Sequence, residues 1–436
     1  MSDLSVAFAA LGLLLGLLLA RVPIAVALGG VSFGGIWLLL GLKPALNILV
    51  SIPYEFTASW TLSSVPMFLL MGYVCFHARL TDGLFQAARL WLSWLPGGLA
   101  VSSVGAAAAF SAVTGSSVAC AAAIGRIAVP EMLASRYDKS LAAGVCAAAG
   151  TIGSLIPPSI LMLLYGLFVD APIGRLFMAG FLPGLLTAAL YALMIIVRAK
   201  LSPGLAPATG VGASWRDRLA IIPQVGPTAL LVIFVFAGLF SGFFTPTEAG
   251  AAGAGAALVI AACKSRLNLK TMWEALNETL VTTASIFIIA IGASLLTRFL
   301  ALAGFTDHLS ELVLAYELSQ TELLIAVALV YLVLGCFLDP LGIMLLTLPI
   351  FMPLVEVAEI DLIWFGILVV KLLEVGLVTP PVGLNIFVIK GVLGDRIRTE
   401  QIYAGVLWFI AMDVVVLALI IAFPQVSLVL PDLLMD

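Results

Sequence analysis

Long apolar runs dominate the chain, and polar positions interrupt them at only a few places. A run of about 20 apolar residues is long enough to cross the hydrocarbon core of a bilayer as a helix. The runs are continuous and do not alternate between apolar and polar positions, so they predict helices and not strands. The expected membrane-spanning segments are residues 4–20, 22–42, 62–79, 175–198, 220–242, 247–263, 280–303 and 402–424.

Four apolar regions between these segments carry small, polar or proline residues in their middle. We expect 98–130 and 320–355 to be re-entrant hairpins, and 140–170 and 361–392 to be helices broken by Pro-Pro. Irregular backbone persists inside a bilayer only where protein or a water-filled cavity satisfies its polar groups. These four regions are therefore where the sequence predicts a functional site.

The second half of the chain repeats features of the first. The two Pro-Pro pairs are 223 positions apart, and the same shift places Pro23 on Pro246 and Pro130 on Pro353. Internal repeats that contain broken helices are typical of secondary transporters. The sequence therefore predicts two structural repeats.

The charges predict how these repeats are oriented. Basic residues flank the first hairpin region and acidic residues flank the second, and basic loops favour the cytoplasm. Equivalent hairpins are therefore expected to enter the membrane from opposite sides. The predicted organisation is two inverted five-span repeats, residues 1–198 and 220–436, joined by a cytoplasmic linker at 199–219.

Composition excludes most other classes of protein. Hydrophobic residues make up 63% of the 436 positions and charged residues 10%, against about 45–50% and about 25% in soluble domains. Soluble enzymes and nucleic-acid-binding proteins are thereby excluded, and the expected fold class is an all-α polytopic membrane protein. The sequence has no Walker A or H-E-x-x-H motif, and its two histidines and five cysteines are scattered singly. We therefore expect no catalysis, no bound cofactor and no His/Cys metal site.

The two Pro-Pro segments carry oxygen atoms suited to an alkali cation. One runs from Gly150 to Ser159 and the other from Gly376 to Asn385, with glycines upstream of each proline pair. Because proline donates no backbone hydrogen bond, it frees carbonyl groups upstream, and unwound carbonyls in transporters coordinate Na⁺. Simple proline kinks would leave the same pattern, but two breaks at equivalent repeat positions favour ion sites.

The two hairpin regions offer hydroxyl groups and one carboxylate. The first contains Thr114, Ser116 and Ser117 around a glycine, a pattern that fits either an oxygen-rich tip or ordinary packing of small residues. The second contains Asp339 deep in an apolar run. An intramembrane carboxylate is a functional candidate by default, and Asp339 before Pro340 also fits a helix cap.

Three further charged residues fall inside apolar runs. Lys371 and Glu374 lie three residues apart on one expected helix face, and the first interpretation is a mutually neutralising pair. The alternative is that Lys371 binds an anionic substrate. Arg126 follows the first hairpin tip, and it either binds a carboxylate or extends to the cytoplasmic face.

The residues from Thr245 to Glu248 have the pattern of a helix N-terminus. Thr245 fits an N-cap, Pro246 fits the first helical position, and Glu248 fits the reciprocal residue of a capping box. We therefore expect a helix to begin at Pro246.

Taken together, these residues resemble the large membrane subunit (the M, or DctM-like, subunit) of tripartite ATP-independent periplasmic (TRAP) transporters. The resemblance covers nearly the whole chain. Its most specific segments are Gly115-Ser-Ser117, Ala-Ala-Ala-Ile-Gly125, Val-Pro130-Glu-Met132, Gly150 to Ser159, Thr245-Pro-Thr-Glu-Ala249, Leu338-Asp-Pro340 and Gly376 to Asn385.

This resemblance implies an elevator-type carrier in the bacterial cytoplasmic (inner) membrane. The hairpins and broken helices would form a mobile transport domain, and a Na⁺ gradient would drive uptake of an organic acid (a carboxylate). A periplasmic binding protein would deliver the substrate, and a small four-helix membrane subunit would be present as a separate chain.

The resemblance also implies where ions and substrate bind. The first Na⁺ site would comprise Thr114, Ser116, Ser117, Gly150, Gly153 and Pro157. The second would comprise Gly335, Asp339, Gly376, Thr379, Pro380 and Pro381. The candidate substrate contacts are Arg126, Ser159, Lys371 and Asn385.

Two other functions fit parts of the sequence. A stand-alone Na⁺/anion symporter of similar architecture would work without partners, and copurification with a small four-span protein would distinguish it. A non-transporting membrane scaffold subunit is the third reading, but it leaves intramembrane Asp339 and both paired breaks unexplained.

Overall fold

The computed structural model describes residues 3–207, 214–316 and 319–435, and helices form all the regular structure within these ranges. The helices before the central linker are α1 (Asp3–Leu19), α2 (Ile24–Leu40), α3 (Leu42–Thr57), η1 (Trp60–Ser63), α4 (Ser64–His77), α5 (Asp82–Leu92), α6 (Gly98–Thr114), α7 (Ser117–Ala134), α8 (Lys139–Gly150), η2 (Thr151–Ser154), α9 (Ile160–Val169) and α10 (Ile173–Leu201). Those after it are α11 (Trp215–Ala220), α12 (Ile222–Phe240), α13 (Pro246–Cys263), α14 (Leu269–Leu302), α15 (Phe305–Ala315), α16 (Gln320–Gly335), α17 (Pro340–Val357), α18 (Leu362–Gly376), α19 (Leu384–Leu393), η3 (Gly394–Arg396), α20 (Thr399–Ala422) and α21 (Gln425–Met435). The elements η1, η2 and η3 are short 3₁₀ helices.

Among the described residues, 8 helical segments are long and apolar enough to cross a membrane. Six of them coincide with predicted spans, and the other two, α7 and α17, belong to the predicted hairpin regions. The first two predicted spans form α1 and α2, which are apolar but only 17 residues long. The structure thus confirms the all-helical membrane fold.

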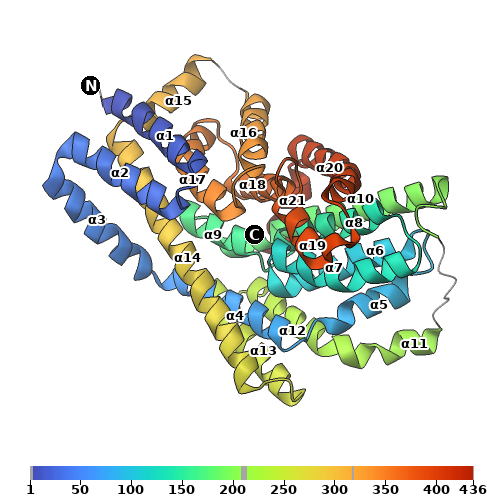
Figure 1. Ribbon diagram of the computed structural model, residues 1–436. Coiled ribbons are helices and arrows are strands. Elements are labelled where there is room, and N and C mark those ends of the chain that lie inside the picture. The colour runs from blue at the N-terminus through green and yellow to red at the C-terminus, as the bar shows by residue number, and fades with distance from the viewer. Residues whose placement is uncertain (1–2, 208–213, 317–318, 436) are drawn as a thin grey trace.

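Both predicted hairpin regions fold as two helices joined by a short turn. In the first, α6 ends at Thr114 and α7 begins at Ser117, and the two helices lie side by side (Figure 1). In the second, α16 ends at Gly335 and α17 begins at Pro340. The small and acidic residues singled out in the sequence therefore lie at the turns.

Both predicted Pro-Pro regions are helices interrupted in the middle. The first interruption separates α8 from α9, and the second separates α18 from α19. Both Pro-Pro peptide bonds are cis. The order of hairpin followed by interrupted helix therefore occurs in each half of the chain. The inverted orientation of the halves and the boundary between them stay predictions.

The predicted helix start at Pro246 is confirmed. Thr245 Oγ1 accepts a hydrogen bond from the Glu248 backbone N–H at 3.3 Å, and the Glu248 carboxylate accepts one from the Thr245 backbone N–H at 2.9 Å. This reciprocal pair satisfies two donors that a helix N-terminus otherwise leaves free.

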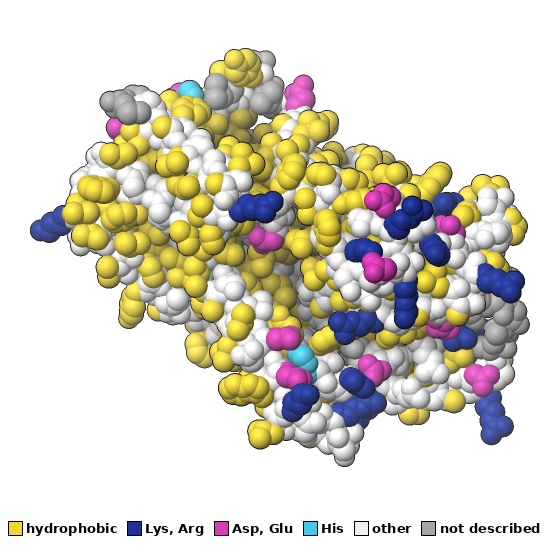
Figure 2. Space-filling model, in the orientation of Figure 1, with side chains coloured by type: hydrophobic (Ala, Val, Ile, Leu, Met, Phe, Trp, Pro, Cys, Tyr) yellow, Lys and Arg dark blue, Asp and Glu magenta, His cyan; other side chains and the backbone are white. Residues whose placement is uncertain are grey.

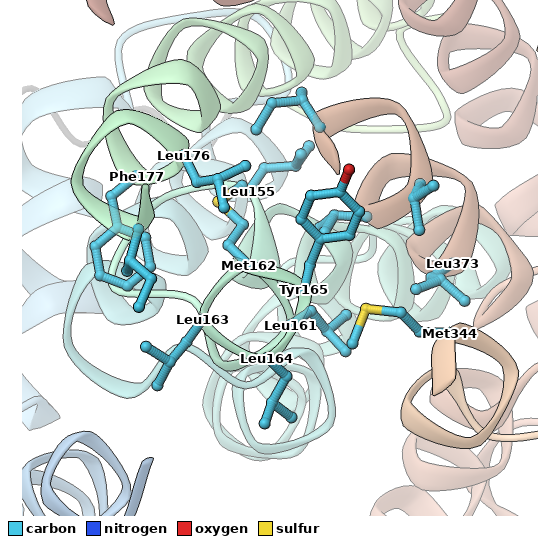
Figure 3. Packing of buried hydrophobic residues seen from close by; sticks show 14 of the residues in the cluster. Leu155, Leu161, Met162, Leu163, Leu164, Tyr165, Leu176, Phe177, Met344 and Leu373 are labelled. Carbon is cyan, nitrogen blue, oxygen red and sulfur yellow. The ribbon is translucent and has the colours of Figure 1, made fainter. Parts of the chain in front are cut away.

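A shared hydrophobic core joins the elements of the two halves. It brings together Leu161 and Leu164 of α9, Phe177 of α10, Met344 of α17 and Leu373 of α18 (Figure 3). All five side chains are buried. Because lipid is as apolar as these side chains, their close packing holds the helices together mainly through van der Waals contact.

The long helix α14 crosses the molecule diagonally and packs against α2 and α4 (Figure 1). Hydrophobic side chains cover much of the upper left of the surface, whereas Lys and Arg gather mainly toward the lower right (Figure 2). Many large apolar side chains are exposed, including Val50, Tyr54 and Trp60. This distribution is the one expected of a protein whose sides face lipid.

Candidate functional site

A cavity of about 300 Å³ lies where the two hairpin turns meet α4 and α14. We call it the central cavity. The first turn lines it with residues from Thr114 to Ala119, and the second turn lines it with Asp339 and Pro340. The rest of the polar and aromatic lining comes from two sides. The first break contributes Ser154 and α18 contributes Glu374, and the opposite wall contributes Tyr73, Phe76, Glu278 and Thr282.

The first turn packs directly on the first break. Gly115 adopts a left-handed conformation (φ 60°), and a Cβ added there would collide with the carbonyl oxygen of Pro158. A Cβ on Gly150 would lie 2.8 Å from the Ser117 carbonyl oxygen, and one on Gly153 would lie 3.2 Å from the Ser117 nitrogen. Only glycine permits such close approach of two backbones.

Hydroxyl groups and one carboxylate gather at this contact. Ser117 Oγ donates to Glu374 Oε2 at 2.5 Å and lies 3.0 Å from Ser154 Oγ. Ser116 caps the start of α7, and Thr114 Oγ1 donates to the Phe110 carbonyl at 3.3 Å. Five of the six residues predicted for the first Na⁺ site thus come together, and Pro157 is buried within the adjoining break.

The second turn packs on the second break in a similar way. A Cβ on Gly335 would lie 2.8 Å from the Gly376 Cα. Cys336 Sγ donates to the Pro380 carbonyl at 3.2 Å, and Thr379 Oγ1 donates to the Val375 carbonyl at 2.7 Å. The turn and break predicted to form the second Na⁺ site are therefore in contact.

Asp339 and Pro381 occupy the edges of this second contact. Asp339 caps α17, since its Oδ1 accepts from the Gly342 backbone N–H at 2.9 Å, and its half-buried carboxylate also lines the central cavity. Cap and cavity wall are thus compatible roles. Pro381 is exposed, and its carbonyl accepts a hydrogen bond from Tyr403. One of the carbonyl groups expected to bind Na⁺ therefore already accepts a hydrogen bond from the protein.

The four candidate substrate contacts do not come together. Ser159 is buried and caps α9, and Asn385 is buried with its Nδ2 donating to the Ala147 carbonyl at 3.2 Å. Lys371 is enclosed between α18 and α20, and Arg126 lines a different cavity. None of the four is among the residues that line the central cavity, so their contact with a substrate stays a prediction. Sequence spacing alone does not show which wall of a bundle a side chain reaches.

The predicted pairing of Lys371 with Glu374 is wrong. Lys371 Nζ lies 2.5 Å from Asp413 Oδ1, and both side chains have 0% exposure. Tyr191 donates to the same Asp413 oxygen at 2.7 Å. Residues three apart on a helix differ in direction by about 60°, which lets Lys371 extend to α20 while Glu374 extends to the first hairpin turn.

Sequence reasoning missed Asp413, although a signal was present. Asp413 is the one charged residue within the predicted span 402–424, and an intramembrane carboxylate is a functional or structural candidate. Its Oδ2, together with Glu374 Oε1 and Asn385 Oδ1, is buried without a hydrogen-bond partner among the described residues.

Comparisons with known proteins fit this architecture. The family described as "Tripartite ATP-independent periplasmic transporter, DctM component" matches residues 11–426. The C4-dicarboxylate TRAP transporter large permease protein DctM of Pseudomonas aeruginosa is 34% identical over 90% of this chain and 93% of its own length. The sialic acid TRAP transporter large permease protein SiaM of Vibrio cholerae is 31% identical over 96% of this chain and 97% of its own.

A solved structure shares the fold at low sequence identity. The YdaH transporter of Alcanivorax borkumensis superposes with a TM-score of 0.61 at 15% identity, over 88% of this chain and 89% of its own. The family match and the relative at 34% identity each extend over nearly the whole chain. The chain therefore belongs to the DctM component family of tripartite ATP-independent periplasmic transporters and is a multi-pass membrane protein.

Proposed function

We propose that this chain is the large permease subunit of a Na⁺-coupled transporter that imports a small organic acid across the bacterial inner membrane. Relatives named for C4-dicarboxylate and sialic acid support an organic acid as the substrate class. The observation that carries the proposal is the central cavity, which both hairpin turns line with oxygen-bearing residues.

The charge of this cavity supports cation coupling. Its lining includes the carboxylates of Glu278, Asp339 and Glu374, and no Lys or Arg among the described residues lines it. Two like charges 4 Å apart repel by about 4 kcal/mol at an effective dielectric constant of 20. An organic anion therefore binds here only after cations have neutralised the wall. Na⁺ at the two turns supplies that neutralisation, which makes ion binding a condition for substrate binding.

The position of the cavity supports an elevator movement. One wall consists of the hairpins and the interrupted helices, and the opposite wall consists of α4 and α14. Movement of the first group past the second carries the bound ion and substrate across the membrane and changes the side on which the cavity opens. Each turn stays on its own broken helix during this movement because the two are closely packed. The contacts are those of Gly335 with Gly376 and of Gly115 with the first break.

Two protein partners complete the proposed transporter. A periplasmic binding protein delivers the substrate, and a small four-helix membrane subunit, encoded as a separate chain, helps to hold the mobile transport domain in the membrane. The word "tripartite" in the family description supports such partners. Copurification of this chain with a small membrane protein tests the assembly, and function of the chain alone would favour the stand-alone symporter instead.

Uptake into proteoliposomes tests the transport function. Vesicles containing this chain, its small subunit and its binding protein receive an inward Na⁺ gradient, and uptake of radiolabelled succinate and sialic acid is measured. We expect uptake of at least one acid with Na⁺ and none with K⁺ or choline. Equal uptake in K⁺ would contradict Na⁺ coupling.

A further inference from the structure

A second cavity, of about 570 Å³, lies beside the central cavity, and Phe76 lines both. We call it the arginine cavity. One wall is formed where α4 meets α5, with Glu274 of α14, and the other wall is formed by α6 and α7. Like the central cavity, it is lined by α4 and α14 on one side and by α7 on the other.

Helix α7 connects the two cavities. Its first residue, Ser117, lines the central cavity, and Arg126 lines the arginine cavity. Nine residues of α-helix separate them, which is about 13 Å along the axis. The basic flanks of the first hairpin region place this end of α7 toward the cytoplasm. The arginine cavity thus lies on the cytoplasmic side of the central one.

Each acidic side chain of the arginine cavity already has a basic neighbour, Lys270 for Glu274 and Arg266 for Asp82. Glu274 lies 3.5 Å from His77 and 3.8 Å from Lys270, and Asp82 lies 3.9 Å from Arg266. By contrast, the guanidinium groups of Arg79 and Arg126 have no acidic partner within the described ranges. Two guanidinium groups and two carboxylates thus balance within the lining, and among the described residues Arg79 and Arg126 are the charged groups there left without a partner to bind an anion.

We infer that the arginine cavity is an anion-binding site for a small carboxylate on the release path, with Arg126 as its principal contact. The identity of the anion as a transported acid rests on the proposed function. When Na⁺ leaves the central cavity, its carboxylates repel the substrate. Arg126 and Arg79 then bind the substrate on the cytoplasmic side of Phe76, and the guanidinium fork fits a carboxylate in two hydrogen bonds.

The electrostatic part of this inference is testable without transport. Ile127 lines the arginine cavity and is 43% exposed, so Ile127→Cys provides a labelling site. The change is made in full-length chain carrying Cys263→Ser and Cys336→Ser, because the remaining cysteines are buried. The rates of modification by an anionic and a cationic methanethiosulfonate reagent are then compared in nanodiscs.

The expected result is that Arg126→Gln lowers the anionic-to-cationic rate ratio about fivefold, as loss of one neighbouring charge predicts after partial screening by salt. Arg216→Gln, which removes an exposed charge outside the cavity, serves as the matched control and leaves the ratio unchanged. A ratio that responds equally to both substitutions, or to neither, overturns the assignment.

Protection experiments identify the ligand class. Succinate slows labelling of Ile127→Cys when Arg126 is present and not in Arg126→Gln, whereas neutral succinamide has no effect in either. Protection that follows an anionic phospholipid in the nanodisc, and not succinate, assigns the site to a lipid headgroup and overturns the release-path role. Succinate protection in a protein that fails to transport acids would keep the anion site and refute only the proposed function.

Discussion

The buried pair of Lys371 and Asp413 gives a quantitative prediction. Both side chains have 0% exposure and their charged atoms lie 2.5 Å apart. Removing one member leaves the other as an uncompensated buried charge, which costs about 3–5 kcal/mol. We therefore expect Lys371→Met to lower the free energy of unfolding by about 3–5 kcal/mol.

Asp413→Leu is expected to cost more. It leaves the Lys371 charge without its partner. It also removes the acceptor of the Tyr191 hydroxyl, and this unsatisfied buried donor adds about 1–3 kcal/mol to the loss of stability. The contact of Tyr191 with Thr151, at 3.4 Å, is too long to replace that acceptor fully. The double variant Lys371→Met/Asp413→Leu contains neither charge, so only the Tyr191 penalty of about 1–3 kcal/mol remains.

Equilibrium unfolding followed by tryptophan fluorescence measures the free energies of unfolding of the parent chain, the two single variants and the double variant. Lys270→Met is the matched control, because Lys270 is 84% exposed and its contact with Glu274 is 3.8 Å; it is expected to change stability by less than about 1 kcal/mol. If the two single changes simply add in the double variant within about 0.5 kcal/mol, the charges do not interact and the account of α18 and α20 is refuted.

Three further predictions follow from the turns and caps. Gly115→Ala is expected to lower the free energy of unfolding by at least about 1 kcal/mol more than Gly304→Ala does. Both positions have positive φ, but only at Gly115 would a Cβ meet a backbone, that of Pro158. Thermal unfolding compares the two variants, and equal losses of stability contradict the close packing. Thr245→Ala removes the cap of α13 and is expected to lower stability by about 0.5–2 kcal/mol in the same assay, so an unchanged midpoint argues against the capping box. Ser117→Ala removes the hydroxyl donor to the Glu374 carboxylate and is expected to weaken Na⁺-dependent uptake severalfold, whereas unchanged dependence on Na⁺ excludes this serine from the site.

Features governed by neighbouring residues could be predicted from the sequence. The Pro-Pro breaks, the capping box at Thr245 and the cap at Asp339 each depend on local backbone chemistry, and the structure contains all three. The contact of Gly335 with Gly376 could be expected only from the family resemblance, which places each turn and its break in one site. Of these features, the cap residue Asp339 also lines the central cavity.

Features governed by packing between distant helices could not be predicted. Lys371 pairs with a residue 42 positions away on α20, where spacing along one helix had favoured Glu374. Arg126 faces a separate cavity because the direction of α7 carries it away from the turn. Spacing along one helix does not show which faces of distant helices meet, so the structure separates the four candidate substrate contacts, and their role stays a prediction.

Na⁺-specific stabilisation of the purified chain tests the central claim most directly. The thermal unfolding midpoint is measured in NaCl and in matched potassium and choline chlorides, for the parent chain and for Asp339→Asn. A ligand present at 100 times its dissociation constant stabilises the folded state by about 2.7 kcal/mol. The account predicts a rise specific to Na⁺ in the parent that shrinks in Asp339→Asn, and equal midpoints in all three salts for the parent would contradict it.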